Sequence, residues 1–170
     1  HFADVDAVPV VLDVHQPEQI IATIKAIAPS FGAINLEDIA APKCFEIEEH
    51  LKAELDIPVF HDDQHGTAVV VLVGLINAAK LTRRNLADCK FVVIGAGAAG
   101  TAIIKLLHLY GARNIVAVDS RGIVGASRTD LNAEKTALLE YVNASQVGSI
   151  EDAVTDADVF IGVSRAGLLT

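Results

Sequence analysis

The chain has 170 residues, of which 52% are apolar and 21% charged, a composition typical of a globular protein. Acidic residues outnumber basic ones by 22 to 13, and the net charge of −9 argues against a nucleic-acid partner. The longest uncharged stretches fall short of the roughly 20 residues that a membrane helix needs, so we expect no membrane partner. The two cysteines, Cys44 and Cys89, predict reduced thiols in a cytoplasmic protein. Because the chain contains no methionine, we expect it to be a central piece of a longer polypeptide.

Short apolar runs alternate with helical patterns in the first half of the chain. Strands are predicted at Val8–Leu12, Ala33–Leu36 and Ile57–Phe60. Helices are predicted to begin at Pro17 and Pro42, because proline suits the first turn of a helix. The glutamates of the second helix, Glu48 among them, are expected to be solvated charges. This alternation predicts parallel βαβ units.

A long apolar helix is predicted at Thr67–Lys80, and its hydrophobicity on nearly all sides predicts burial between layers or domains. The polar junction Leu81–Lys90 follows, and the alternation then restarts. The later strands are predicted at Phe91–Ile94, Asn114–Val118 and Asp158–Gly162, and the later helices at Ala98–Tyr110, near Asn132–Val142 and near Ile150–Thr155. We therefore predict an α/β protein in two parts, residues 1–85 and a Rossmann-type domain over residues 86–170.

A glycine-rich turn, Gly95 to Gly100, follows the strand Phe91–Ile94 and opens a helix. Gly95 permits the tight turn, Gly97 lets the backbone approach a pyrophosphate, and Gly100 lets the helix pack against the sheet. The helix N-terminus offers N–H groups to phosphate. Asp119 closes the next strand, where an acid would bind a ribose diol. The pattern predicts a dinucleotide site made by Gly95, Ala96, Gly97, Ala98, Ala99, Gly100 and Asp119.

The choice between NAD and NADP stays open at this point. Asp119 favours the free 2′-hydroxyl of NAD because a carboxylate repels a 2′-phosphate. Arg121 could instead pair with that phosphate, although a plain surface charge is the simpler role for it.

Four carboxylates follow the ends of two predicted strands, as Glu37-Asp38 and Asp62-Asp63. Ligands of open parallel sheets bind at this edge, and carboxylates gathered there repel one another unless a cation is present. Hard oxygen ligands suit Mg²⁺ or Mn²⁺. Capping of the following helices is the alternative role, above all for Asp38. A zinc site on His61 and His65 would need both on one helix face, whereas we expect a loop there.

Four segments resemble malic enzymes, especially the short bacterial type, and occur in the right order along the chain. They are Phe31–Phe45 (FGAINLEDIAAPKCF), Ile57–Ala68 (IPVFHDDQHGTA), Ile94–Gly100 (IGAGAAG) and Asp158–Ser164 (DVFIGVS). The resemblance covers essentially the whole chain. The acidic segments are specific to the family, whereas the glycine turn alone is not.

The resemblance implies roles for individual residues. It implies metal ligands at Glu37, Asp38 and Asp63, with Asp62 behind them as a proton-relay acid. It adds Ser164 to the cofactor site, although Arg165 follows where family members often have a smaller residue. The family's general acid Tyr and general base Lys are expected outside this chain, since neither Tyr110 nor Tyr141 is in a position to replace that Tyr.

The implied reaction is the oxidative decarboxylation of L-malate to pyruvate and CO₂ with reduction of NAD or NADP. A divalent metal stabilises the enolate that forms as CO₂ departs. The resemblance thus predicts a metal-dependent oxidoreductase, with self-association expected at the edge strand Val159–Val163. Two alternatives remain: a noncatalytic nucleotide-binding module, or another NAD(P)-dependent dehydrogenase that shares the Rossmann half and needs no metal.

Overall fold

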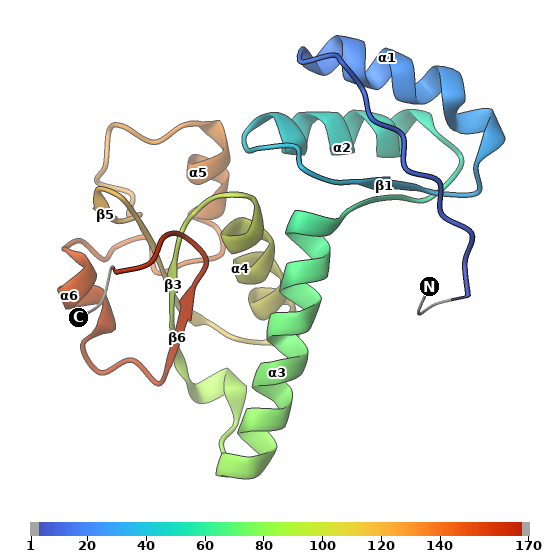
Figure 1. Ribbon diagram of the computed structural model, residues 1–170. Helices are drawn as coiled ribbons and strands as arrows, with labels where there is room; N and C mark the ends of the chain where they lie inside the picture. The colour runs from blue at the N-terminus through green and yellow to red at the C-terminus, as the bar shows by residue number, and fades with distance from the viewer. Residues whose placement is uncertain (1–3, 168–170) are drawn as a thin grey trace.

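The computed structural model describes residues 4–167 and contains two separate sheets. The smaller sheet pairs β1 (Ile34–Leu36) with β2 (Val59–His61), and the larger has the strand order β5-β4-β3-β6. Helix α3 (Thr67–Thr82) connects the two sheets and runs beside α4, as Figure 1 shows. The predicted α/β class with parallel strands is confirmed.

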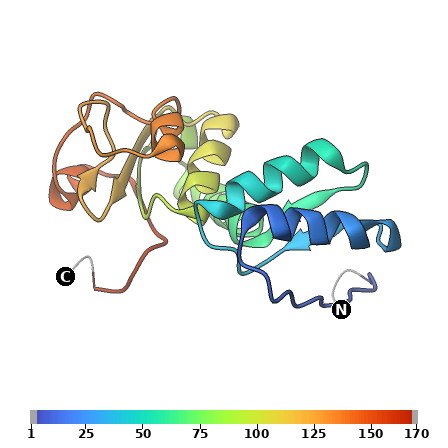
Figure 2. The same cartoon turned by 90° about the horizontal axis from the view of Figure 1, so that it is seen from above.

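The smaller sheet is covered by α1 (Pro17–Ile27) and α2 (Lys43–Glu54), which lie side by side in Figure 2. Proline occupies the first turn of α1, as predicted, and precedes the first residue of α2. The buried side chains between these elements are Ile20, Ile24, Leu36, Ile47, Leu51 and Val59. Burying this apolar area from two helices and two strands stabilises the unit.

The strand predicted at Val8–Leu12 is wrong. The structure assigns no regular element to these residues, and Val11 is 95% exposed. The strands of the smaller sheet pair only with each other in the described part of the chain, so this apolar run has no neighbouring strand to complete its backbone hydrogen bonds.

The larger sheet is formed by the second half of the chain. The strands of this sheet and the helices between them are, in chain order, β3 (Lys90–Ile94), α4 (Ala98–Tyr110), β4 (Asn114–Asp119), β5 (Gly122–Ile123), α5 (Ala133–Leu138), α6 (Ile150–Val154) and β6 (Val159–Gly162). Strand β3 alternates between two cores, with Phe91 and Val93 in the core that includes α4 and with Val92 and Ile94 facing α6. Short 3₁₀ turns occupy Ala28–Ser30 and Leu86–Asp88. The antiparallel strand β5, only two residues long, was not predicted.

Helix α3 differs from its prediction in burial. Ala68 is its only fully buried residue, one side packs against α4, and Val70 is 72% exposed. The helical path also begins earlier in the chain, because a π-helical turn over Asp62–Gly66 runs directly into α3 where a loop was predicted. The apolar residues of α3 therefore pack against α4 on one side of the helix, and they are not buried on both sides as predicted.

The combined helix Asp62–Thr82 has 21 residues, longer than the uncharged stretches from which no membrane helix was expected. By length and composition alone it could cross a membrane. This is a weak indication, because helices of proteins that never enter a membrane meet the same criterion.

Candidate functional site

The turn between β3 and α4 lies at the centre of the larger sheet. Strand β4 pairs with one side of β3 and β6 with the other, so the order of the strands reverses at β3. Open α/β sheets bind ligands beyond the carboxyl ends of the strands at such a reversal. Gly95 has a φ of +113°, and a Cβ there would lie 2.9 Å from the Val163 carbonyl oxygen. A Cβ on Gly100 would lie 1.7 Å from the carbonyl oxygen of Gly95. The fold itself therefore requires these two glycines.

Gly97 differs from Gly95 and Gly100, because nothing in the described fold requires it to be glycine. Its φ of −98° is open to other residues, and a Cβ there would have no neighbouring atom within 4 Å. Gly97 precedes α4, whose first N–H groups receive no side-chain cap, and Ala98 and Ala99 open the helix. Bare backbone beside uncapped N–H groups at a helix N-terminus suits the close approach of a phosphate.

A solvent-open hollow of ≈410 Å³ lies beside this turn, within the size range of ligand pockets. It is lined by the ends of β3 and β6 and by the segment from Val163 to Gly167. A Cβ on Gly95 would lie 3.1 Å from the Cβ of Ser164, so Ser164 lies against the glycine turn. Partly buried Ala96 lies within the turn itself. The structure thus brings the predicted cofactor residues of the turn and Ser164 together.

Asp119 ends β4, and its carboxyl is surrounded by donors. The Arg128 guanidinium donates to it at 2.8 Å, the Lys135 ammonium at 2.5 Å, and the Arg121 backbone N–H at 2.9 Å. Burial acts to raise the pKa of Asp119, but these hydrogen bonds outweigh it and hold the pKa below its ordinary value. Asp119 is therefore an ionised, firmly oriented carboxylate at neutral pH.

The Arg121 side chain pairs with Asp130 at 2.7 Å and remains 69% exposed. Arg128 bridges the two acids, since it also pairs with Asp130 at 2.6 Å. Hydrogen bonds from Arg128 and Arg121 hold the pKa of Asp130 far below its ordinary value, against the opposing effect of desolvation. Three cations thus face two carboxylates at the end of β4, which weakens the repulsion of Asp119 toward a 2′-phosphate and leaves NAD and NADP both open.

The predicted acidic residues follow the carboxyl ends of β1 and β2, and these ends lie at the same edge of the smaller sheet because the two strands are parallel. Glu37 and Asp38 follow β1, and Asp62 and Asp63 follow β2. The backbone N–H of Asp38 donates a hydrogen bond to Oδ2 of Asp63 at 3.2 Å. Two of the three predicted metal ligands are therefore in direct contact.

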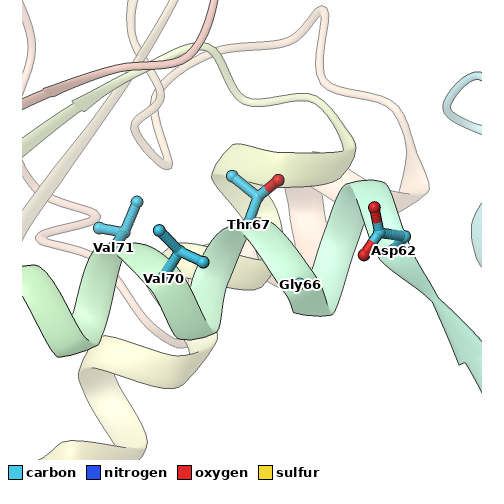
Figure 3. A pocket seen from close by; sticks show the side chains of 5 residues that line it. All are labelled: Asp62, Gly66, Thr67, Val70 and Val71. Atoms are coloured by element: carbon cyan, nitrogen blue, oxygen red, sulfur yellow. The ribbon is translucent and has the colours of Figure 1, made fainter. Parts of the chain in front are cut away.

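Asp62 lies at the start of the helical path that continues through Gly66 and Thr67, as Figure 3 shows. Its carboxyl lies over Gly66, where a Cβ would come within 2.3 Å of Oδ1, and it lines a hollow with Thr67, Val70 and Val71. Asp62 and Asp63 thus make different contacts, although they are adjacent in the chain.

Within residues 4–167, no group of three or more His, Cys, Asp or Glu side chains is close enough to hold a metal ion. Glu37 and Asp38 are exposed and Asp63 is half-buried. Their carboxylate oxygens, with no thiolate among them, fit the chemistry of Mg²⁺ or Mn²⁺. The trio of Glu37, Asp38 and Asp63 stays a prediction, of which the structure provides the Asp38–Asp63 contact.

His61 and His65, considered for zinc, have different surroundings. His61 is fully buried at the end of β2, and neither ring nitrogen has a hydrogen-bond partner among the described residues. Nε2 of His65 contacts Oε1 of Glu48 at 2.7 Å. Within residues 4–167, the two histidines belong to no group of three or more possible metal ligands.

The expectation that Glu48 is a solvated charge is wrong, and this residue was missed. It is 5% exposed, and its Oε2 accepts a hydrogen bond from Nε2 of Gln64 at 3.1 Å. The signal in the sequence was its spacing, because Glu48 lies four residues after Cys44 and three before Leu51, both fully buried on α2. Residues at these intervals share one helix face.

Comparison with known families places both halves of the chain. The model described as "Malic enzyme, NAD binding domain" matches residues 64–169, and the one described as "Malic enzyme, N-terminal domain" matches residues 1–52. The bifunctional malic/malolactic enzyme of Bacillus subtilis is 53% identical over 99% of this chain and 42% of its own length. The NAD-dependent malic enzyme of Geobacillus stearothermophilus is 54% identical over 99% of this chain and 35% of its own.

A solved structure and a further sequence relative belong to the same family. The NAD-dependent malic enzyme of Thermotoga maritima superposes with a TM-score of 0.95 at 48% identity, covering 99% of this chain and 46% of that one. An NADP-dependent malic enzyme of Halomonas elongata is 44% identical over 99% of this chain and 40% of its own length. The chain spans less than half the length of each of these four relatives.

Proposed function

Because the chain belongs to the malic enzyme family, we propose that it forms part of an NAD(P)-dependent oxidoreductase. The proposed reaction is the oxidative decarboxylation of L-malate to pyruvate and CO₂, with Mg²⁺ or Mn²⁺. The observation that carries the proposal is the contrast among the three glycines: the fold demands Gly95 and Gly100, whereas Gly97 faces open space. A glycine that the fold does not need is best explained by a ligand that approaches its backbone.

The dinucleotide half of the site is proposed at the C-terminal edge of the larger sheet. The backbone of Gly97 and the first N–H groups of α4 would bind the pyrophosphate. The fixed carboxylate of Asp119 would accept hydrogen bonds from the ribose, with Arg128 and Lys135 holding it in place. Ser164, which lies against the turn, would contact the cofactor from β6.

The cation half is proposed at the edge of the smaller sheet, with Glu37, Asp38 and Asp63 as ligands. The hydrogen bond from the Asp38 N–H to Asp63 supports this set, since it already joins the two turns that carry the acids. Mg²⁺ or Mn²⁺ held by these carboxylates would supply positive charge to offset negative charge on substrate oxygen, and a dinucleotide held at the glycine turn would supply the hydride acceptor.

The residues of this chain bind and orient the reactants. The carboxylates hold the cation side, the glycine turn holds the dinucleotide, and Asp62 is proposed as an acid that relays protons near the metal ligands. The proton-transfer Tyr and Lys are proposed to lie outside this chain. We place the division between the two functional parts at residues 1–85 and 86–170, because each range contains one of the two sheets.

Cellular setting and assembly are also proposals. We infer a cytoplasmic enzyme in which the two cysteines remain reduced, and both are free and buried in this structure. Self-association is proposed at β6, which lies at the edge of the sheet formed by the described residues and whose Phe160 is 45% exposed. Light scattering on the intact protein tests the assembly.

The cation site is tested by titrating Mn²⁺ into the intact protein that contains this chain. Asp63→Asn keeps an oxygen that can accept the Asp38 hydrogen bond but removes the charge, so we expect Mn²⁺ affinity to fall at least about tenfold with the fold intact. Glu49→Gln, on the exposed side of α2, is the matched control. Unchanged Mn²⁺ affinity in Asp63→Asn removes the metal assignment.

The two alternatives predict different results. A noncatalytic nucleotide-binding module binds NAD or NADP but has no need for Mn²⁺, and a dehydrogenase of another kind stays active in the presence of a chelator. A malic enzyme loses activity when EDTA removes the cation and regains it on addition of Mn²⁺.

A further inference from the structure

We propose that Glu48 is a positioning residue: from helix α2 it fixes the turn Asp62–Gly66, and so sets the Asp63 carboxyl for cation binding. This inference rests on the proposed function. Glu48 accepts hydrogen bonds from Gln64 at 3.1 Å and contacts His65 at 2.7 Å, and both residues follow Asp63 directly in the chain.

The burial of Glu48 calls for an explanation. Its neighbour Glu49 is exposed, as charged residues of a surface helix usually are, whereas only 5% of Glu48 is exposed. A buried carboxylate is tolerated only where hydrogen bonds and opposite charges replace its lost hydration. Lys52, one turn later on α2, supplies the opposite charge at 2.6 Å. The remaining partners come from the turn that carries the acidic pair, so the buried carboxylate connects α2 to that turn.

The turn is thereby held on both sides of Asp63. On one side, Asp63 accepts the hydrogen bond from the Asp38 N–H, 25 residues earlier. On the other, Gln64 and His65 are held by Glu48, 16 and 17 residues earlier. The turn itself is π-helical, a rare form that occurs mostly as single turns within helices and frequently at functional sites. The contacts of Asp63, Gln64 and His65 hold three of its five residues.

Asp38 and Glu48 belong to the same stretch of chain, since Asp38 lies just before α2. The two contacts thus join this stretch to the turn at two points. A cation bound between Asp38 and Asp63 would have these two of its three proposed ligands fixed relative to α2. Removing a group that bonds a metal ligand directly commonly costs 10- to 100-fold in metal affinity. Glu48 acts one step further out, on the two residues that follow the ligand Asp63, so the lower end of that range is expected.

The experiment measures Mn²⁺ affinity, NAD⁺ affinity and thermal unfolding on the intact protein for Glu48→Gln and for the control Glu49→Gln. Glu48→Gln removes the charge and one acceptor while keeping the size of the side chain. We expect its Kd for Mn²⁺ to rise at least about tenfold. The Kd for NAD⁺ should stay within about twofold, because the glycine turn lies on the other sheet. Glu49→Gln should change neither.

A second pair of variants covers the case in which Glu48→Gln fails to fold. His65→Leu removes the donor to Glu48, and His65→Gln restores an uncharged one. Mn²⁺ affinity should fall in His65→Leu and recover at least in part in His65→Gln. A general loss of structure would instead weaken Mn²⁺ and NAD⁺ binding together.

The outcomes separate the inference from the function on which it rests. If the unmodified protein fails to bind Mn²⁺, the proposed function fails. If it binds Mn²⁺, loses it in Asp63→Asn and keeps it in both Glu48→Gln and His65→Leu, the proposed function stands and the positioning role of Glu48 is overturned.

Discussion

The backbone N–H of Asp38 donates a hydrogen bond to the carboxyl of Asp63 across 3.2 Å, joining turns that follow two parallel strands. Asp38 has a φ of +57°, a left-handed conformation that aspartate tolerates better than most residues. The backbone at Asp38 is thus shaped to present its N–H, and its side chain remains exposed for a ligand.

The conformation of Asp38 gives the first prediction. Asp38→Gly should leave the free energy of unfolding within about 0.5 kcal/mol, because glycine adopts positive φ freely. Asp38→Ala should lower it by about 1 kcal/mol. Both variants should lose Mn²⁺ affinity to a similar extent. Urea unfolding and Mn²⁺ titration measure the two effects, and equal loss of stability in both variants would show that the backbone conformation is not the cause.

The glycine turn gives a second prediction: substituting Gly100 should lower stability, whereas substituting Gly97 should weaken dinucleotide binding. Gly100→Ala should destabilise the protein by more than about 2 kcal/mol, because its Cβ would lie 1.7 Å from a backbone oxygen. Gly97→Ala should leave stability nearly unchanged, since its Cβ would meet no atom within 4 Å, yet should weaken dinucleotide binding at least about tenfold. Thermal unfolding and NAD⁺ titration distinguish the two. Full NAD⁺ affinity in a folded Gly97→Ala variant would place the pyrophosphate elsewhere.

Asp119 gives a prediction about pH. Asp119→Asn removes the carboxylate that pairs with both Arg128 and Lys135, so the free energy of unfolding should fall by about 1–3 kcal/mol at pH 7. The folded-state pKa of Asp119 lies below its ordinary value, so its contribution is complete above the ordinary value and is lost as the pH falls through the folded-state pKa. The difference between wild type and variant should therefore shrink only below about pH 4. A difference that vanishes near pH 6 would contradict the ion-pair account.

Cys44 gives a prediction about reactivity. Burial, reinforced by the charge of Glu48 and opposed by backbone hydrogen bonds, raises the pKa of this thiol to about 11. The reactive thiolate is therefore scarce at pH 8, and the side chain is fully buried. In a Cys89→Ser variant, Ellman's reagent should leave Cys44 unlabelled in the folded protein and label it after unfolding in guanidinium. Rapid labelling of the folded variant would show that the segment around Cys44 opens.

Elements bounded by glycines or other turn residues could be predicted from the sequence. The bounds of α4, Ala98–Tyr110, agree with the structure because glycines stand on both sides of it and Gly111 adopts a φ of +115°. The strands around it are short apolar runs between turn residues, which is also a local signal. The turn Gly95–Gly100 could be placed for the same reason.

Other features depend on contacts that no local pattern contains. The run Val8–Leu12 has the composition of a strand but no strand beside it in the described structure, and α3 packs on one side only. Asp62 and Asp63 are adjacent in sequence, yet one lies over Gly66 and the other contacts Asp38. Glu48 was misassigned because its partners Gln64 and His65 come from a distant turn. In each case the structure depends on contacts between residues that are distant in the sequence.

One assay on the intact protein decides whether this chain belongs to a metal-dependent malic enzyme. The intact protein is incubated with L-malate, Mn²⁺ and either NAD⁺ or NADP⁺, and nicotinamide reduction and pyruvate are followed together, with and without EDTA. A metal-dependent malic enzyme should give equal amounts of reduced cofactor and pyruvate with at least one dinucleotide, and no product with EDTA. Cofactor reduction that continues in EDTA, or that yields no pyruvate, would contradict this assignment.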